Sequence, residues 1–308
     1  MLGADLLTSL GVAAAADLPA SEKRFADGAH FRIEIPSTEG PSVSRAVLEE
    51  AGRRGIRIHR MSQGSGVTML SRDERADWVR LGAEHDCELS LYVRPTASWG
   101  TGAGWTTQTG RPLAGQAHGA AQLAAALDQV RRACADGFRG VLITDLGVLA
   151  GVNELRERGE LPAELSIKVG VQMSVANPLA ARTVERLGAG TINVPSDCTL
   201  ADLAAIRAAV DVPLDIYIES PDDLGGFVRV HEIADIVRVA APVYLKFGLR
   251  NAPGLYPSGT HLDDAARSLA RERVRRTQLG LELLAELAPE LITTTGRADL
   301  AVPVPPPA

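Results

Sequence analysis

Cysteine is scarce in this chain. Its 308 residues include only Cys87, Cys134 and Cys198, and no two of them form a Cys-x-x-Cys pair. Zinc and iron–sulfur sites in proteins usually contain cysteines at such short spacing, so we expect neither a zinc site nor an iron–sulfur cluster. A small, odd number of cysteines also suits a reducing compartment, and we expect a cytoplasmic location.

Long apolar runs and an excess of positive charge are missing as well. No stretch approaches the roughly 20 apolar residues of a membrane span, so we expect no contact with a membrane. The apolar stretch 6–16 lacks a basic leader and lies between Asp5 and Asp17, which argues against a signal peptide. The net charge of −6 disfavours nucleic acid as a partner. A small-molecule substrate and a homo-oligomer remain compatible with this composition.

What the chain does contain is a regular alternation of short apolar runs and helix-patterned segments. Eight such runs, each with a polar or charged residue at or next to its end, predict the parallel strands of a (β/α)8 TIM barrel, an α/β fold. The expected strands are Phe31–Ile35, Ile56–His59, Leu89–Arg94, Val141–Asp145, Leu165–Gln172, Thr191–Val194, Leu214–Glu219 and Val243–Phe247.

The barrel accounts for most of the chain. We expect one catalytic domain over residues 29–290, because such barrels take about 250 residues. Residues 1–28 form an N-terminal extension, expected to hold a short helix that closes the bottom of the barrel or contacts a neighbour. Residues 291–308 form a proline-rich tail, expected to be extended or disordered.

Some connecting segments carry recognisable signals. Ser71 and Glu74 predict a capping box, and Thr199 with Asp202 predicts a second helix start. The last helix, expected over 263–287, carries Arg267, Arg271, Arg273, Arg275 and Arg276, which we interpret as a solvated, salt-bridged face.

One connection is unusually long. Residues 95–119 are rich in glycine and contain Trp99 and Trp105. Long loops in compact domains are often functional, so we interpret this one as a lid that closes over the substrate, against the alternative of a merely flexible loop.

Period-two alternation in the strands predicts a charged barrel interior, because the outer face of each strand must pack on apolar helices. Arg32, Arg57 and Asp215 are expected to lie one layer deeper, as ion-paired filling. The upper layer, where a substrate could reach, is expected to comprise Glu34, His59, Arg94, Asp145, Gln172, Asn193, Glu219 and Lys246.

These residue types suggest proton transfer. Glu219 and His59 are candidate acid/base groups, with Lys246 and Asp145 completing the expected catalytic set. His59 could instead bind a metal or simply be a hydrogen-bonded interior histidine. Lys246 could stabilise developing negative charge or, less expectedly, form a Schiff base.

Two further kinds of site are expected at the same rim. Arg94 and Arg250 could clamp a carboxylate or phosphate, with Gln172 and Asn193 as further substrate-binding groups. The carboxylates of Glu34, Asp145 and Glu219 could converge on a divalent cation, unless the neighbouring cations neutralise them.

Residues 141–206 resemble peptidase family U32, the collagenase-like peptidases. The resemblance rests on Thr144-Asp145-Leu146-Gly147, on Gln172 followed by Asn177, on Leu187-Gly188-Ala189, and on the helix entry Ser196-Asp197-Cys198-Thr199-Leu200. It implies a barrel of this type, with Asp145, Gln172 and Asn177 at its mouth, although Asn177 could equally cap a helix that begins at Pro178.

The resemblance does not indicate a single activity. The family includes peptidases, and other members hydroxylate RNA bases or quinone precursors with a four-cysteine iron–sulfur cluster. This chain has too few cysteines for that cluster, so it would be a divergent member.

Three hypotheses follow. The first is a barrel enzyme that acts on a small anionic or polyhydroxylated substrate by acid/base proton transfer, as an isomerase, epimerase or lyase. The second is a hydrolase of peptides that uses a metal-activated water. The third is a non-catalytic barrel that serves as a subunit of a heteromeric complex.

Overall fold

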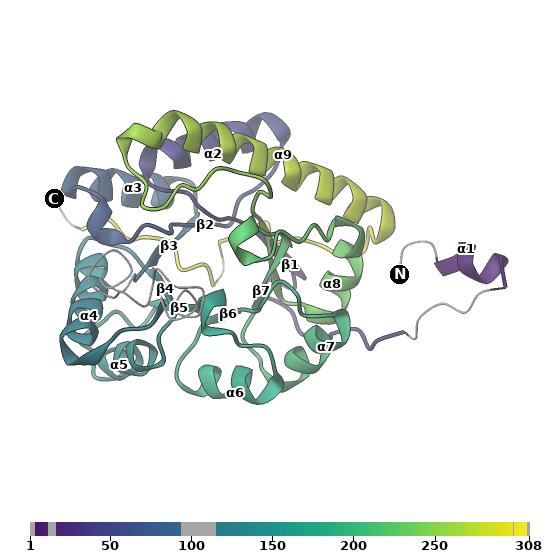
Figure 1. The fold of residues 1–308 in the computed structure, drawn as a ribbon, viewed down its shortest axis with the longest axis horizontal. Coiled ribbons are helices and arrows are strands. Elements are labelled where there is room, and N and C mark those ends of the chain that lie inside the picture. Colours follow the sequence, from purple (N-terminus) through teal and green to yellow (C-terminus); the bar gives the residue numbers. More distant parts are fainter. Residues whose placement is uncertain (1–3, 12–16, 94–114, 298, 307–308) are drawn as a thin grey trace.

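The computed structural model describes residues 4–11, 17–93, 115–297 and 299–306. Eight parallel strands close into a barrel in the order in which they follow one another along the chain, and the first strand pairs with the last. Figure 1 shows the described helices, apart from the N-terminal one, arranged around this barrel. The expected (β/α)8 TIM barrel is confirmed.

The observed strands follow the predicted order. They are β1 (Phe31–Ile35), β2 (Arg60–Ser62), β3 (Glu88–Tyr92), β4 (Gly140–Ile143), β5 (Ser166–Val169), β6 (Thr191–Asn193), β7 (Leu214–Glu219) and β8 (Val243–Phe247). The α-helices are α1 (Ala4–Ser9), α2 (Pro41–Arg54), α3 (Arg72–Glu84), α4 (Gly119–Ala135), α5 (Leu146–Glu157), α6 (Pro178–Arg186), α7 (Leu200–Ala209), α8 (Ile233–Ala240) and α9 (Asp263–Leu287).

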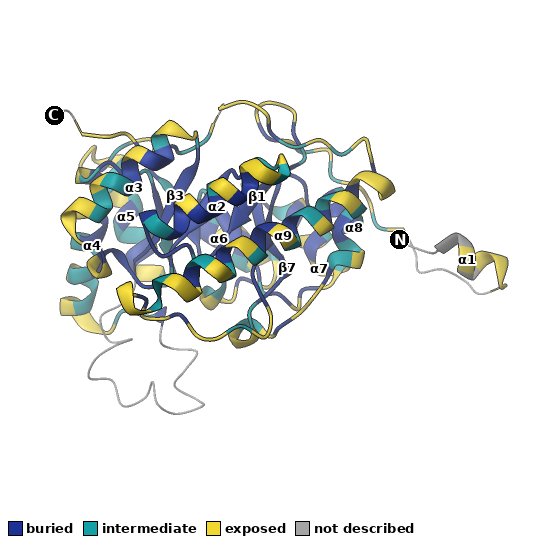
Figure 2. Ribbon diagram, turned by 90° about the horizontal axis from the view of Figure 1, so that it is seen from above, coloured by how far each residue is buried: buried dark blue, intermediate teal, exposed yellow. Residues whose placement is uncertain are grey.

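The apolar core lies between the strands and the helices. Residues such as Ile33, Leu89, Ile167 and Leu245 are fully buried there. Figure 2 shows that the buried residues of α2 and α9 face the strands, while their exposed residues face outward. Because the outer strand face is apolar, alternation sends the polar residues into the barrel.

The barrel interior is ionic, as expected. The Lys168 ammonium on β5 contacts both carboxylate oxygens of Glu34 on β1, across the barrel. The guanidinium of Arg60 lies 3.1 Å from the Asp215 carboxylate and 2.8 Å from that of Glu88.

The second strand departs from its prediction. Residues 56–59 precede β2, which begins at Arg60, so Arg60 and Ser62 face the interior in place of Arg57 and His59. Arg57 instead donates to the backbone carbonyls of Thr295 and Gly296. The apolar run Ile56-Arg57-Ile58 could not reveal this shift, because the interior carboxylates that select Arg60 lie on other strands.

The two chain ends close the bottom of the barrel. The Phe25 ring lies 3.9 Å from the Arg32 guanidinium and packs edge-on against Tyr244. From the C-terminal tail, Asp299 pairs with Arg32, and the Ala301 amide donates to Glu88. The short helix expected in the extension is α1, which exposes Leu6 at 63%, so the closure comes from Phe25 instead.

The tail and the helix starts agree with local sequence signals. Residues 301–306 form neither helix nor strand, Val302 is buried, and the Val304 amide donates to the Gly137 carbonyl. Ser71 and Thr199 both form the predicted capping boxes. None of the described helices combines the length and apolar character needed to cross a lipid bilayer.

Candidate functional site

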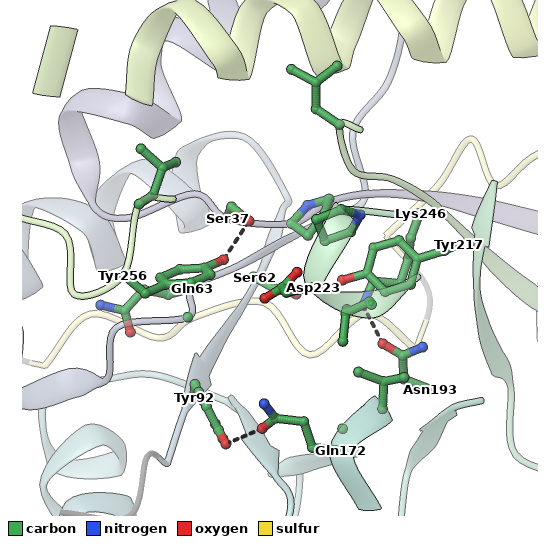
Figure 3. Close-up of a pocket in the computed structure, with 18 of the residues that line it drawn as sticks. Ser37, Ser62, Gln63, Tyr92, Gln172, Asn193, Tyr217, Asp223, Lys246 and Tyr256 are labelled. Atoms are coloured by element: carbon green, nitrogen blue, oxygen red, sulfur yellow. Dashed lines mark hydrogen bonds between the residues drawn. The ribbon is translucent and has the colours of Figure 1, made fainter. Parts of the chain in front are cut away.

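A cavity of about 370 Å³ opens at the carboxyl ends of the strands. In a (β/α)8 barrel this is the end at which catalytic and binding groups gather. The polar side chains that line it come from several strand ends and following loops, as Figure 3 shows; among them are Ser62, Gln63, Tyr92, Gln172, Asn193, Tyr217, Asp223 and Lys246.

Lys246 on β8 supplies one of the positive charges of the cavity wall. Its ammonium donates to the side-chain oxygen of Asn193, and lies 4.1 Å from the centre of the Tyr217 ring. The nearest carboxylate oxygen, on Glu34, is 3.5 Å away. A cation held by an amide, an aromatic face and a carboxylate that two other cations share is poised to attract an anionic ligand.

The Glu34 carboxylate does not neutralise Lys246 alone, because other cations share it. Lys168 contacts both of its oxygens, Arg60 lies at 3.2 Å, and the Ser62 hydroxyl donates at 2.5 Å. Burial by itself would raise the pKa of Glu34, but Lys168, Lys246 and Arg60 hold that pKa well below its usual range. Glu34 therefore remains a carboxylate throughout the physiological pH range.

Lys168 lies deeper than Lys246 in the same ionic cluster. Its side chain is 2% exposed and also lies 3.1 Å from Asp215. Burial lowers the pKa of Lys168 to about 8, against the opposing effect of Asp215 and Glu34. Lys168 does not line the cavity, so its part is to neutralise and position Glu34 beneath Lys246.

A second wall is built from neutral hydrogen-bonding groups. The Tyr92 hydroxyl donates to Gln172 at 2.7 Å and lies 2.9 Å from the Thr144 hydroxyl. Thr144 in turn donates to the Gly115 carbonyl. These contacts fix the orientation of Gln172, which lies in the short helix η5 (Val171–Met173) and lines the cavity. Gln172 is one of the expected substrate-binding residues.

The loop after β7 contributes the carboxylates of the cavity. Asp222 and Asp223 begin the short helix η6 (Asp222–Leu224), and both line the cavity. Asp222 accepts a hydrogen bond from the Asn251 amide at 2.6 Å. Figure 3 shows Asp223 between Ser62 and Tyr217, in the middle of the group of labelled side chains.

Three of the expected site residues therefore meet in the cavity: Lys246, Asn193 and Gln172. Arg94, Trp99 and Trp105 lie outside the described residues, as does most of the expected lid. Arg250 sits at the rim with its side chain 60% exposed, 3.8 Å from Asp222, and does not line the cavity.

Glu219 does not point into the cavity. The pairing of β7 with β8 shifts between Tyr217 and Glu219, and this bulge breaks the alternation on which its inward orientation was predicted. One carboxylate oxygen accepts from the Arg250 amide at 2.9 Å, and the other faces Arg276 of α9 at 3.8 Å. Its position supports the loop after β8.

Asp145 also has a structural position. It is the N-cap of α5, where its carboxylate accepts from the Val148 amide at 2.8 Å and from the Ala117 amide at 3.0 Å. Asn177 has the corresponding place at α6 and accepts from the Ala180 amide, so its helix-capping interpretation is the one observed.

His59 lies below β2, remote from the cavity lining. Its Nδ1 accepts from the Ile33 amide, and its Nε2 lies 2.9 Å from the Thr294 carbonyl. Burial lowers the pKa of His59 to about 4, with Arg57 and Arg32 adding to the effect and the Thr294 hydrogen bond opposing it. The ring is a neutral, hydrogen-bonded interior histidine.

The expected metal carboxylates do not come together. Glu34 is surrounded by cations, Asp145 caps a helix and Glu219 faces α9. Among the described residues, no three His, Cys, Asp or Glu side chains form a group that could hold a metal ion. The structure thus contradicts the proposed triad, because each carboxylate has a different protein partner.

Several residues of the cavity were not anticipated, among them the charged Asp222, Asp223 and Arg273. Asp223 follows β7 in a Pro-Asp-Asp sequence, a polar signal that could have placed it at the rim. Arg273 of α9 also lines the cavity and is 4% exposed. The expectation that all five arginines of this helix are solvated is therefore wrong for Arg273.

Comparison with known proteins finds a similarity to one family over part of the chain. Residues 116–220 match the model of peptidase family U32. Over this part of its length, the chain is similar to peptidase family U32. The U32 match encloses the residues that suggested the resemblance and spans β4 to β7, including Gln172, Asn193 and Tyr217. Lys246 and Arg273 lie beyond it. A barrel with this relationship fits an enzyme, without specifying its reaction.

Solved structures with similar folds are distant in sequence. The U32 peptidase Mk0906 is 19% identical, with a TM-score of 0.40 over 67% of this chain and 75% of that one. The thiamine phosphate pyrophosphorylase from Pyrococcus furiosus is 15% identical, with a TM-score of 0.43 over 80% and 96%. Oxaloacetate acetylhydrolase, in complex with oxalate, is 12% identical, with a TM-score of 0.45 over 86% and 85%. No curated protein matches the chain.

Proposed function

We propose that this barrel is an enzyme that acts on a small anionic substrate by proton transfer, as an isomerase, epimerase or lyase. The observation that carries the proposal is the environment of Lys246. Its ammonium lines the cavity, yet the nearest carboxylate is shared with Lys168 and Arg60. A cation in this situation can stabilise negative charge that develops on a bound substrate.

The chemistry needs a base as well as a cation. Asp223 is the candidate, because it lies in the cavity beside Tyr217 and because a carboxylate can remove a proton from a carbon next to a carbonyl or carboxylate group. Lys246 would stabilise the resulting oxyanion, with Asn193 holding the ammonium in place. His59, Asp145 and Glu219 take no part in this scheme, because their side chains serve the fold.

The test does not require the substrate to be known. The protein is incubated in D₂O with 2-oxo acids, 2-hydroxy acids and sugar acids, and incorporation of deuterium at carbon is followed by NMR. Lys246→Met and Asp223→Asn should each lower the exchange rate by about 10²-fold or more, as expected for loss of an oxyanion partner or base. Lys23→Met is the matched control, because Lys23 pairs with the exposed Asp211 far from the cavity lining. Exchange that persists at the wild-type rate in Lys246→Met would refute the proposal.

Hydrolysis of a peptide is the second candidate, supported by the description of the matching family. The cysteines are poor nucleophiles for it: burial raises the pKa of Cys134 and Cys198 to about 11, and that of Cys87 further still. A metal-activated water would need ligands other than Glu34, Asp145 and Glu219, because each of these carboxylates has a different protein partner. Peptide turnover that a chelator abolishes, and that Lys246→Met leaves unchanged, would favour hydrolysis over proton transfer.

A further inference from the structure

Arg273 differs in its burial from three other arginines of α9, which form ion pairs on the helix surface. Arg267, Arg275 and Arg276 are 38%, 48% and 40% exposed in their side chains, and each pairs with an acidic residue one helical turn away. Arg273 is 4% exposed and lines the cavity from the helix layer, between the ends of β7 and β8 and the loop after β1.

The bonds that Arg273 makes do not satisfy its charge. One guanidinium nitrogen donates to the Ser37 carbonyl at 3.4 Å, and its buried Nε has no hydrogen-bond partner. Over the described parts of the chain, it forms no ion pair with any carboxylate. Burial lowers the pKa of Arg273, although Tyr256, Glu39 and Tyr217 oppose the shift.

Glu39 is a nearby acid, but its carboxylate is already engaged. It accepts hydrogen bonds from the Gly64 amide, the Ser65 amide and the Ser65 hydroxyl, at 2.8, 3.0 and 2.5 Å. Arg273 and Glu39 therefore contribute long-range attraction without a direct contact. A buried cation with unfilled hydrogen-bonding capacity is costly, and a bound anion would remove that cost.

We propose that Arg273 is the binding site for an anionic oxygen group, a carboxylate or phosphate, of the ligand that occupies the cavity. A guanidinium can bind either group through two parallel hydrogen bonds. The inference rests on the proposed function, to which it adds a substrate class. Lys246 contacts Asn193 and Glu34 whereas Arg273 contacts Ser37, so the two cations have separate partners. A substrate that engages both cations would present one anionic group to Arg273 and a second acidic or carbonyl oxygen to Lys246.

Binding of simple anions tests the assignment. Succinate, malonate and inorganic phosphate are titrated into the wild-type protein by calorimetry at constant ionic strength, with sodium chloride as the blank. Arg273→Met should weaken binding of a dicarboxylate at least about tenfold, as expected for loss of a bidentate charged contact. Arg273→Lys should restore part of it. Arg275→Met, on the exposed face of the same helix, should change nothing.

Thermal unfolding separates ligand binding from a structural role. Without ligand, Arg273→Met should melt at the wild-type temperature or above it, because it removes a buried charge that lacks an ion pair. The stabilisation by added anion should be lost in this variant. A lower melting temperature together with unchanged anion affinity would overturn the assignment, and so would wild-type anion affinity in Arg273→Lys and Arg273→Met alike.

The same panel distinguishes this inference from the proposed function. Anion affinity that depends on Arg273, with no deuterium exchange for any compound, would support the binding site and refute the catalytic proposal. Exchange that depends on Lys246 but is unaffected in Arg273→Met would leave the catalytic proposal standing and overturn the site. Preference for phosphate over dicarboxylates in the wild type would identify phosphate as the group that Arg273 binds.

Discussion

Replacing Glu34 by glutamine should destabilise the protein strongly. Glu34 is fully buried and touches Lys168, Arg60, Lys246 and Ser62. With Glu34, the interior cluster balances three cations (Arg60, Lys168, Lys246) against three carboxylates (Glu34, Glu88, Asp215). Glu34→Gln keeps the shape of the side chain and leaves an excess positive charge in a buried site.

The magnitude follows from measurements on other buried ion pairs, in which removing one partner costs about 3–5 kcal/mol. For a domain of this size, a loss of that order should lower the melting temperature by about 10 °C. Glu154→Gln is the control. Its ion pair with Arg158 is 60% exposed on both sides, and such pairs contribute about 0–1 kcal/mol.

Urea unfolding at pH 7, followed by circular dichroism, measures both variants. The difference between Glu34→Gln and wild type should also depend on pH. Because the folded pKa of Glu34 lies below its ordinary value of 4.5, its contribution is complete above pH 4.5 and disappears as the pH falls through the folded pKa. A Glu34→Gln variant within about 1 kcal/mol of wild type at pH 7 would refute the argument that this carboxylate neutralises the interior cations.

Two other substitutions test the positions assigned to residues outside the cavity. Burial lowers the pKa of His59 to about 4 in the folded protein, against an ordinary 6.5, so the free energy of unfolding of the wild type should fall by up to about 3 kcal/mol as the pH falls from 6.5 to 4. In urea titrations over that range, the unfolding free energy of His59→Gln should depend less on pH. Equal pH dependence in the two proteins would contradict a buried neutral ring. Asp145→Ala should cost about 1 kcal/mol, because it removes the N-cap of α5, while deuterium exchange stays at the wild-type rate; a loss of exchange without a loss of stability would return Asp145 to the site.

Features with a local period or a local cap were predictable from the sequence. Apolar runs separated by helical segments predicted the barrel, and alternation predicted its charged interior, including Glu34, Asp215 and Lys246. Ser71 and Thr199 predicted their own helix starts, because a cap involves residues only three apart. Alternation along the strands also predicted that Lys246, Asn193 and Gln172 lie at the rim of the barrel.

Features that depend on distant partners were not predictable. The start of β2 at Arg60 depends on carboxylates from β1, β3 and β7, and the bulge at Glu219 depends on how β7 pairs with β8. Arg273 looks like its neighbours in the sequence, and its burial is a consequence of how α9 packs over the cavity.

The sequence by itself thus determined the fold and the face on which most polar residues lie, since both follow from short repeats along the chain. Only the tertiary structure decided which charges neutralise one another and which remain to meet a ligand. The physical reason is that ionic partners are chosen by distance and burial, and across a barrel these are unrelated to separation along the chain.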